Sequence, residues 1–72
     1  MIALMLQFNS SCAISAPKGA KIVVFDIDGK KIAELADGQR IWTPEKELGN
    51  GVYFVRAKIG EQTMTKRVVY LR

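Results

Sequence analysis

The acidic residues with the most suggestive spacing are Asp26 and Asp28, which follow an apolar run at 22–25 and precede Gly29. A carboxylate at the end of a buried strand can act as a nucleophile, and a second carboxylate two residues later can act as a general acid or base, with Mg²⁺ bound by both. Calcium is another ion that carboxylates bind, but it takes about six to eight oxygen ligands. Two carboxylates followed by lysines do not supply that number, so the sequence predicts no calcium site.

The segment 22–29 resembles the first motif of haloacid-dehalogenase-type phosphotransferases, which use such an aspartate pair with magnesium. That family continues with Thr or Val after the glycine and then a helix, and it needs a lysine and further aspartates much later in a parallel α/β domain. Here Lys30 follows the glycine, and the next segment has the pattern of a strand. We therefore assign Asp26, Asp28, Gly29 and Lys30 to a structural turn, in which Asp28 forms the turn and Asp26 is the partner of Lys30.

The rest of the sequence offers no catalytic or metal-binding cluster. It has no histidine, the commonest general base and metal ligand, and Cys12 is its single cysteine, so no intrachain disulfide or thiolate zinc site can form. Glu45 and Glu47 could be read as glycosidase carboxylates, but nothing in the sequence positions them. We therefore predict that the protein is not an enzyme and that it uses no metal and no cofactor.

The size and net charge of the chain limit the classes of function that remain possible. A chain of 72 residues forms one domain, 1–72, with one small core, because it buries only about 60% of its unfolded surface. The net charge is +4, but the basic residues near the end stand singly between apolar ones, as on the solvent face of strands, so we predict no nucleic-acid binding. The apolar start is too short for a membrane span, and we expect 1–7 to be a first strand or the remnant of an upstream region.

The pattern of turns and apolar residues predicts an all-β fold. Glycine and proline recur at short intervals, and β-branched and aromatic residues fill the segments between them, which is typical of a small antiparallel β-sandwich of immunoglobulin-like type with six to seven strands. A single helical turn is predicted at 44–48, after proline. The predicted strands are 2–7, 11–16, 20–27, 30–36, 39–43, 51–59 and 62–71. The predicted core includes Ile14, Ile22, Val24, Ile32, Leu35, Tyr53, Val55, Ile59 and Val68.

The hairpin at 20–36 has two plausible registers. A three-residue loop with a bulge at Gly29 sets Asp26 across from Lys30, Val24 across from Ile32 and Val23 across from Ala33, which are charge-complementary and apolar pairs. A two-residue turn would instead set Val23 opposite Glu34. We favour the bulged loop because of its better pairs.

From Phe8 to the end, the sequence resembles the C-terminal sorting domain of the type IX (Por) secretion system, which is related to the immunoglobulin-like module of flagellar hook-capping proteins. Each motif alone is common in β proteins, whereas their order, their spacing and the strand that runs to the last residue are together more specific. The motifs are an opening strand pair at 8–15, a turn at 17–20, the hairpin Asp26–Lys30 with Ile32 and Leu35, a segment ending in Trp42, the strand that begins at Gly51, a turn at Gly60, and the closing strand from Lys66.

The resemblance implies a non-catalytic recognition module that targets a passenger for secretion across the outer membrane of a Gram-negative bacterium, by way of the periplasm. The implied partner is a protein of the secretion machinery, the passenger domain is missing from this chain, and the final location is secreted or on the cell surface. An exposed terminal strand can be bound by edge addition. We expect the recognition residues to be Gly51, Tyr53, Lys66, Arg67, Val68, Val69, Leu71 and Arg72.

Two further expectations concern other surfaces. In an alternative interpretation, the domain is an accessory carbohydrate- or protein-binding β-sandwich that contacts its ligand through Trp42. We also expect open apolar edges at strand 1–7 or strand 62–71 to pair two copies into a homodimer or a larger assembly.

Overall fold

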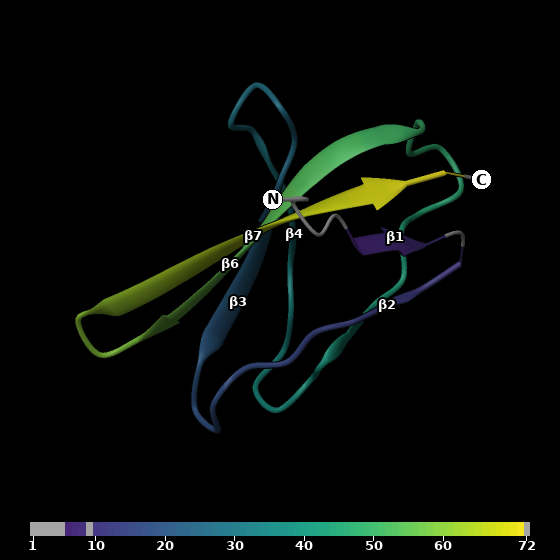
Figure 1. Ribbon diagram of the computed structural model, residues 1–72. Coiled ribbons are helices and arrows are strands. Elements are labelled where there is room, and N and C mark those ends of the chain that lie inside the picture. The colour runs from purple at the N-terminus through teal and green to yellow at the C-terminus, as the bar shows by residue number, and fades with distance from the viewer. Residues whose placement is uncertain (1–5, 9, 72) are drawn as a thin grey trace.

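The computed structural model describes residues 6–8 and 10–71, and it contains two β-sheets (Figure 1). The larger sheet has five strands in the order β1-β7-β6-β3-β4, and the smaller sheet pairs β2 with β5. The bounds are β1 Leu6–Phe8, β2 Cys12–Ala13, β3 Lys21–Phe25, β4 Lys31–Glu34, β5 Ile41–Trp42, β6 Gly51–Ile59 and β7 Gln62–Tyr70. The predicted all-β sandwich is confirmed. Strand β6 has its predicted bounds, whereas β2, β3, β4, β5 and β7 are shorter than predicted. Of the predicted strand 2–7, residues 2–5 lie outside the described residues.

Strands β6 and β7 form a long hairpin that runs through the middle of the sheet. Their ladder extends from the pair Gly51 and Tyr70 to the pair Ile59 and Gln62, and Gly60 turns the chain with a φ of +57°. The two-residue period of β6 explains this arrangement, since Tyr53, Val55 and Ala57 are buried while the residues between them face outward. Figure 1 shows the tip of this hairpin projecting beyond the rest of the sheet.

The β3–β4 hairpin has the predicted bulged loop but not all of the predicted pairs. Asp26 N–H donates to the carbonyl of Lys30 (2.9 Å), and Gly29 has a φ of +87°, as a three-residue loop requires. The register then shifts, so that Val24 faces Ala33 and Val23 faces Glu34. The pairs Val24 with Ile32 and Val23 with Ala33 are therefore wrong.

The register shift has a packing reason. Ile32 is the extra residue between the pair Phe25 and Lys31 and the pair Val24 and Ala33, which is a β-bulge. Because of this bulge, Ile32 and Ala33 both pack against the core although they are consecutive in sequence. The predicted register was chosen from the chemistry of facing residue pairs alone. It therefore did not include the additional apolar contact that the bulge provides.

Strand β1 joins the sheet in parallel to β7, with Leu6 opposite Val68 and Phe8 opposite Tyr70. All other strand pairs are antiparallel. The small sheet covers the inner face of the large one. Next to this sheet, the N–H of Ile14, the residue after β2, donates to the carbonyl of Arg40, the residue before β5 (2.7 Å). The predicted turn at 44–48 is present as a single turn, in which Leu48 N–H donates to the carbonyl of Glu45 (3.0 Å).

The core lies between the two sheets and contains most of the predicted residues. Ile22, Val24, Leu35, Tyr53, Val55 and Val68 are buried, whereas Ile14, Ile32 and Ile59 are half-buried at its margin. The predicted core did not include five further residues of the core cluster, namely Cys12, Ala20, Trp42, Ala57 and Tyr70, nor Val23, which is also buried. The part of the chain that the structure describes includes no helix long and apolar enough to cross a bilayer.

Candidate functional site

The C-terminal strand β7 has two halves with different surroundings. Its last residues are covered, because β1 pairs with 68–70, and Val68 is only 1% exposed. The half from Gln62 to Arg67 pairs with β6 on one side, and no described residue pairs with its other side. We call this N-terminal part of the strand, residues 62–67, the open half of β7, because none of the described residues pairs with its second edge.

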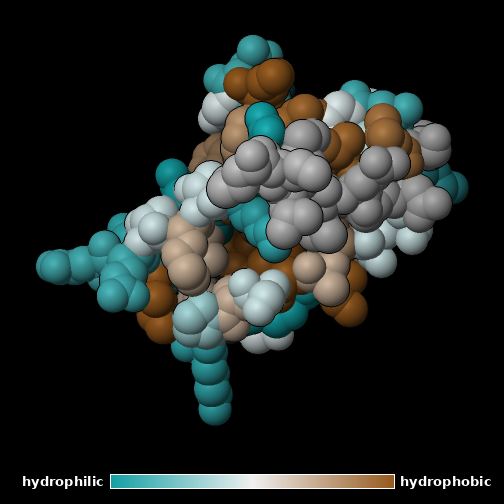
Figure 2. All heavy atoms as spheres, viewed as in Figure 1, coloured by the Kyte–Doolittle hydropathy of each residue, from teal (hydrophilic) through white to brown (hydrophobic). Residues whose placement is uncertain are grey.

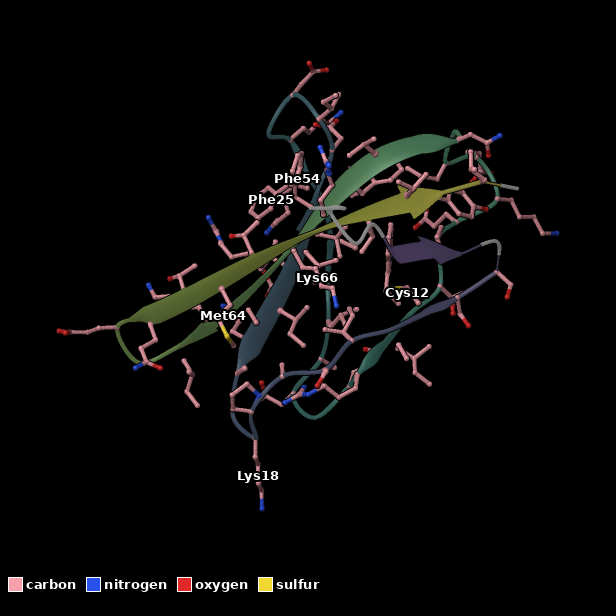
Figure 3. All side chains as sticks on the ribbon, viewed as in Figure 1. Cys12, Lys18, Phe25, Phe54, Met64 and Lys66 are labelled. Carbon is pink, nitrogen blue, oxygen red and sulfur yellow. The ribbon has the colours of Figure 1, made fainter. Side chains whose placement is uncertain are left out.

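A groove runs along the inner face of the open half. It is a cavity of about 280 Å³ between β7 and the β2 segment, lined by Cys12, Ala13, Ile14, Ser15, Val55, Ala57, Met64, Thr65, Lys66 and Val68. Figure 3 shows Lys66 extending from β7 toward the space between the sheets, with Met64 nearer the hairpin tip and Cys12 on the other side. In Figure 2, apolar atoms form the floor of a hollow near the centre of the view.

Met64 is the exposed apolar residue of this groove, with 48% of its surface accessible to solvent. It lies opposite Ala57, on the same face of the sheet as Val68 and Tyr70. The core therefore continues along β7 beyond the area that the small sheet covers, and its continuation is open to solvent.

Cys12 forms the buried end of the groove, and its chemistry is that of a small apolar residue. Burial raises the pKa of the Cys12 thiol above its ordinary value, and the nearby charge of Lys66 opposes this shift only in part. The thiol is therefore protonated at neutral pH. A protonated, buried thiol is a poor nucleophile, so Cys12 contributes packing rather than reactivity.

The outer face of the same hairpin is cationic. Arg67 lies opposite Phe54 in the ladder, and the Arg56 guanidinium stacks over the Phe25 ring at 4.5 Å from its centroid. Lys58 stands on this face as well, beside Lys21 on β3. The Phe25 ring is thus covered by Arg56, and the basic residues form the solvated strand face that the sequence predicted.

Tyr53 and Gly51, both predicted recognition residues, lie where they hold β7 in place. Tyr53 is 7% exposed, its hydroxyl donates to the carbonyl of Gly49 (2.6 Å), and its ring meets that of Trp42 edge-on at a centroid distance of 5.7 Å. Gly51 pairs with Tyr70 and has a φ of +155°, which favours glycine. The side chain of Tyr53 is therefore not free to meet a partner.

The other predicted recognition residues divide between core and surface. Lys66, Arg67 and Leu71 are exposed, Val69 is half-buried and Val68 is buried, while Arg72 lies outside the described residues. Sequence reasoning missed Met64 and Thr65 as groove residues. Their position in 62–67 was visible in the sequence, but the cavity between β7 and the β2 segment was not.

Trp42 does not present a ligand-binding surface. It is 4% exposed and belongs to the core, where it contacts Tyr53. A sugar cannot stack on an indole that is buried between two sheets, so nothing in the structure supports the carbohydrate-binding alternative.

The aspartate pair serves the turn. The Asp26 carboxylate accepts hydrogen bonds from the backbone N–H groups of Asp28 (2.9 Å) and Lys30 (2.8 Å). This arrangement uses Asp26 to stabilise the loop through backbone groups. Within 6–8 and 10–71, no three acidic, cysteine or histidine side chains gather as metal ligands would.

The fold and the C-terminal strand define a small β-sandwich whose distinctive surface is a strand edge, which is a feature of protein-recognition domains. The family of secretion system C-terminal sorting domains matches residues 3–71, and the chain belongs to this family. Comparison with curated proteins and with solved structures gave no match. The domain is a type IX sorting module that targets a passenger protein for secretion, so the passenger is a secreted or cell-surface protein.

Proposed function

We propose that the secretion machinery recognises this module through β7 and the residues that follow it, by contact alone and without catalysis by the module. The observation that supports the proposal is the row of alternating, solvent-exposed side chains at 62–67 of β7, whose edge away from β6 is paired by none of the described residues. Lys66 and Arg67 supply exposed side chains on this strand, and Leu71 supplies another directly after its end. Gly51 and Tyr53 pair with Tyr70 and Val68 of β7 and so support its position.

The proposed route leads from the periplasm of a Gram-negative bacterium across the outer membrane, after which the module is removed from its passenger. In this proposal residues 1–72 act as one domain that needs no metal or cofactor. Because β7 lies between β1 and β6, deleting its residues would remove a strand from the middle of the sheet. Substitutions of exposed residues leave the strand in place, so they test the proposal more directly than a deletion does.

The experiment fuses residues 1–72 to a periplasmic reporter in a host that has the type IX system. We expect export of the reporter, and loss of export in a variant that combines Lys66→Glu, Arg67→Glu and Leu71→Asp. Lys18→Glu is the matched control, because Lys18 lies in an exposed turn far from β7 (Figure 3). Circular dichroism confirms that each variant folds. Retention of the reporter in the periplasm, or equal export of the triple variant, would refute the proposal.

We further propose that the isolated chain self-associates, as its open edges suggest. The open half of β7 and the exposed Met64 are the features that support pairing of two copies, by edge contact or by exchange of strand 1–7 or strand 62–71. Sedimentation equilibrium at micromolar concentration tests this proposal. A single species of 8.0 kDa would show that the chain is a monomer.

A further inference from the structure

The outer face of the large sheet carries a shallow hollow that the proposed recognition of β7 does not use. Strands β3, β4 and β6 supply its residues, and the two ladders set Val23 opposite both Arg56 and Glu34. Figure 3 shows Phe25 and Phe54 on the side of the sheet away from Cys12, so the hollow faces away from the core between the sheets. This cationic hollow has a volume of about 320 Å³ and is lined by Lys21, Val23, Phe25, Lys31, Glu34, Arg56 and Lys58.

The cationic hollow has an excess of three positive charges, because four of its lining residues are basic and only Glu34 is acidic. The Glu34 carboxylate already pairs with Lys31 (3.3 Å) and with Lys21 (3.8 Å). Among the described residues, no carboxylate lies within ion-pair distance of Arg56 or Lys58. The described part of the chain therefore leaves this excess of charge to solvent or to a partner.

Two of the basic residues face each other across the strands. Lys21 is the direct ladder partner of Lys58, and like charges directly opposite each other destabilise a sheet. A lysine opposite a glutamate would stabilise the same pair of strands, so the local pairing rule is broken here without a gain for the fold. Exceptions of this kind are expected at functional positions. A carboxylate bound between the two ammonium groups replaces their repulsion with attraction.

The residues before β1 do not reach the far end of the cationic hollow. Leu6 is level with Tyr53 in the sheet, because both are ladder partners of Val68. From Leu6, Lys21 lies three strand spacings across the sheet and five residues along it, a distance of about 22 Å. Residues 1–5 extend at most about 18 Å from Leu6. The Lys21 end of the hollow is therefore beyond the reach of their backbone.

We propose that the cationic hollow binds an acidic segment of a partner protein, with carboxylates at Lys21 and Lys58 and a small apolar side chain over Val23. This inference goes beyond the proposed recognition through β7, because it concerns other residues on another surface. Opposite charge draws an acidic segment to this face and orients it there. The apolar floor then selects a segment that carries an aliphatic side chain beside its acidic ones.

The shape of the hollow favours a polypeptide over a membrane or a nucleic acid. Val23 is only 8% exposed, so the apolar floor is recessed below the basic rim, whereas binding to a lipid surface needs apolar side chains that enter it. Arg56 covers the Phe25 ring at 4.5 Å from its centroid, so this ring face is not available to a nucleic-acid base. A volume of about 320 Å³ is small for a ligand pocket, and a few side chains of a peptide fill it.

A designed peptide tests the inference on the full chain. The probe is an end-capped, fluorescently labelled peptide of about eight residues that consists of Glu with a central Val. We expect saturable binding by fluorescence anisotropy that weakens as salt is raised, and changes in the NMR shifts of the backbone amides at 21–25, 31–34 and 54–58. A peptide with Lys in place of Glu should show no saturable binding. A peptide with Ser in place of Val should bind about threefold more weakly.

Matched variants locate the binding. Lys58→Glu should weaken the affinity for the peptide about tenfold, and Arg56→Gln should weaken it about threefold. Lys46→Glu makes the same change in net charge as Lys58→Glu, at an exposed position in the turn before β6 and at the opposite end of that strand from Lys58. It should leave the affinity unchanged within about twofold. Equal weakening by Lys58→Glu and Lys46→Glu would mean that net charge alone governs binding, and would overturn the inference.

Thermal unfolding separates a role in binding from a role in the fold. Lys58→Glu should raise the melting temperature by about 1–5 °C at low salt, because it removes the repulsion between Lys21 and Lys58. The same variant thus binds the peptide more weakly and folds more stably. A lower melting temperature would show that Lys58 serves the fold, and would overturn the inference.

Two other probes identify the class of the occupant. Vesicles of phosphatidylcholine and phosphatidylglycerol in equal parts, and an oligothymidylate, should each bind more weakly than the acidic peptide. Tighter binding of either probe, no binding of the peptide, or NMR shift changes confined to 62–71 would overturn the inference. The triple export variant changes no residue of the cationic hollow. Failure of the export proposal therefore leaves this inference standing, and failure of the peptide to bind leaves the export proposal standing.

Discussion

The substitution Tyr53→Phe tests whether the buried tyrosine serves the fold, as its position indicates. The hydroxyl donates to the carbonyl of Gly49 over 2.6 Å, and the ring packs edge-on against Trp42. Phenylalanine keeps the ring and removes only the hydroxyl. The change therefore isolates one hydrogen bond that ties the start of β6 to the loop before it.

The hydrogen bond is part-buried, because Tyr53 is buried and Gly49 is exposed. Removing such a hydrogen bond costs about 0.5–1.5 kcal/mol. For a domain of this size, about 1 kcal/mol lowers the melting temperature by about 4–8 °C. We expect a drop in this range at pH 7, with the fold unchanged by circular dichroism.

The pH dependence gives a second, independent readout. Burial, and to a smaller degree Asp26 and Tyr70, raises the pKa of Tyr53 above its ordinary value. Because the folded pKa is the higher one, the protonated hydroxyl stabilises the native state fully below about pH 10, and this contribution is lost as the pH rises through the folded pKa. The raised pKa of Cys12 produces a similar loss that begins near pH 9.

The assay is thermal unfolding of the native chain and Tyr53→Phe between pH 7 and pH 11. The native chain should lose stability steeply above about pH 10, whereas Tyr53→Phe should lose less over the same interval. A Tyr53→Phe variant that melts at the native temperature at pH 7 and follows the native curve above pH 10 would refute the structural role of the hydroxyl.

Three other expectations concern single positions. Cys12 should react with a thiol reagent at least about a hundredfold more slowly in the native chain than in the denatured one, since it is buried and protonated, and equal rates would contradict this. Gly29→Ala should cost about 1 kcal/mol in denaturant unfolding because of the φ of +87°, and Gly49→Ala, at a glycine without positive φ, should cost clearly less. Val68→Ala should cost about 2 kcal/mol, whereas Ile27→Ala, at a position that is 71% exposed, should change stability by less than about 0.5 kcal/mol; similar losses would show that Val68 is not a core residue.

The features that the sequence predicted well are local ones. The alternation in β6 identified its buried face, and Gly29 identified the loop at the end of β3, because strand period and turn geometry are properties of neighbouring residues. The family resemblance rested on the same local motifs, and the family comparison confirmed it.

The features that escaped prediction depend on contacts between distant segments. The parallel pairing of β1 with β7 joins the two ends of the described chain, and no local pattern specifies such a partner. The bulge at Ile32 lets the consecutive residues Ile32 and Ala33 both pack against a core that distant strands complete.

Strand β1 and the end of β7 also define how the module responds to force. A C-terminal sorting domain follows its passenger in the chain, and in the proposed mode of recognition the machinery holds the end of β7. A pull between passenger and machinery would then act on the sheet at the start of β1 and at the end of β7. Because these strands are parallel, with Leu6 opposite Val68 and Phe8 opposite Tyr70, the load acts along the strands and stretches the bonds of the ladder together. Shear of this kind resists rupture better than peeling one bond after another. The short β1–β7 ladder is thus a mechanical clamp, and its failure would release the whole hairpin from one side.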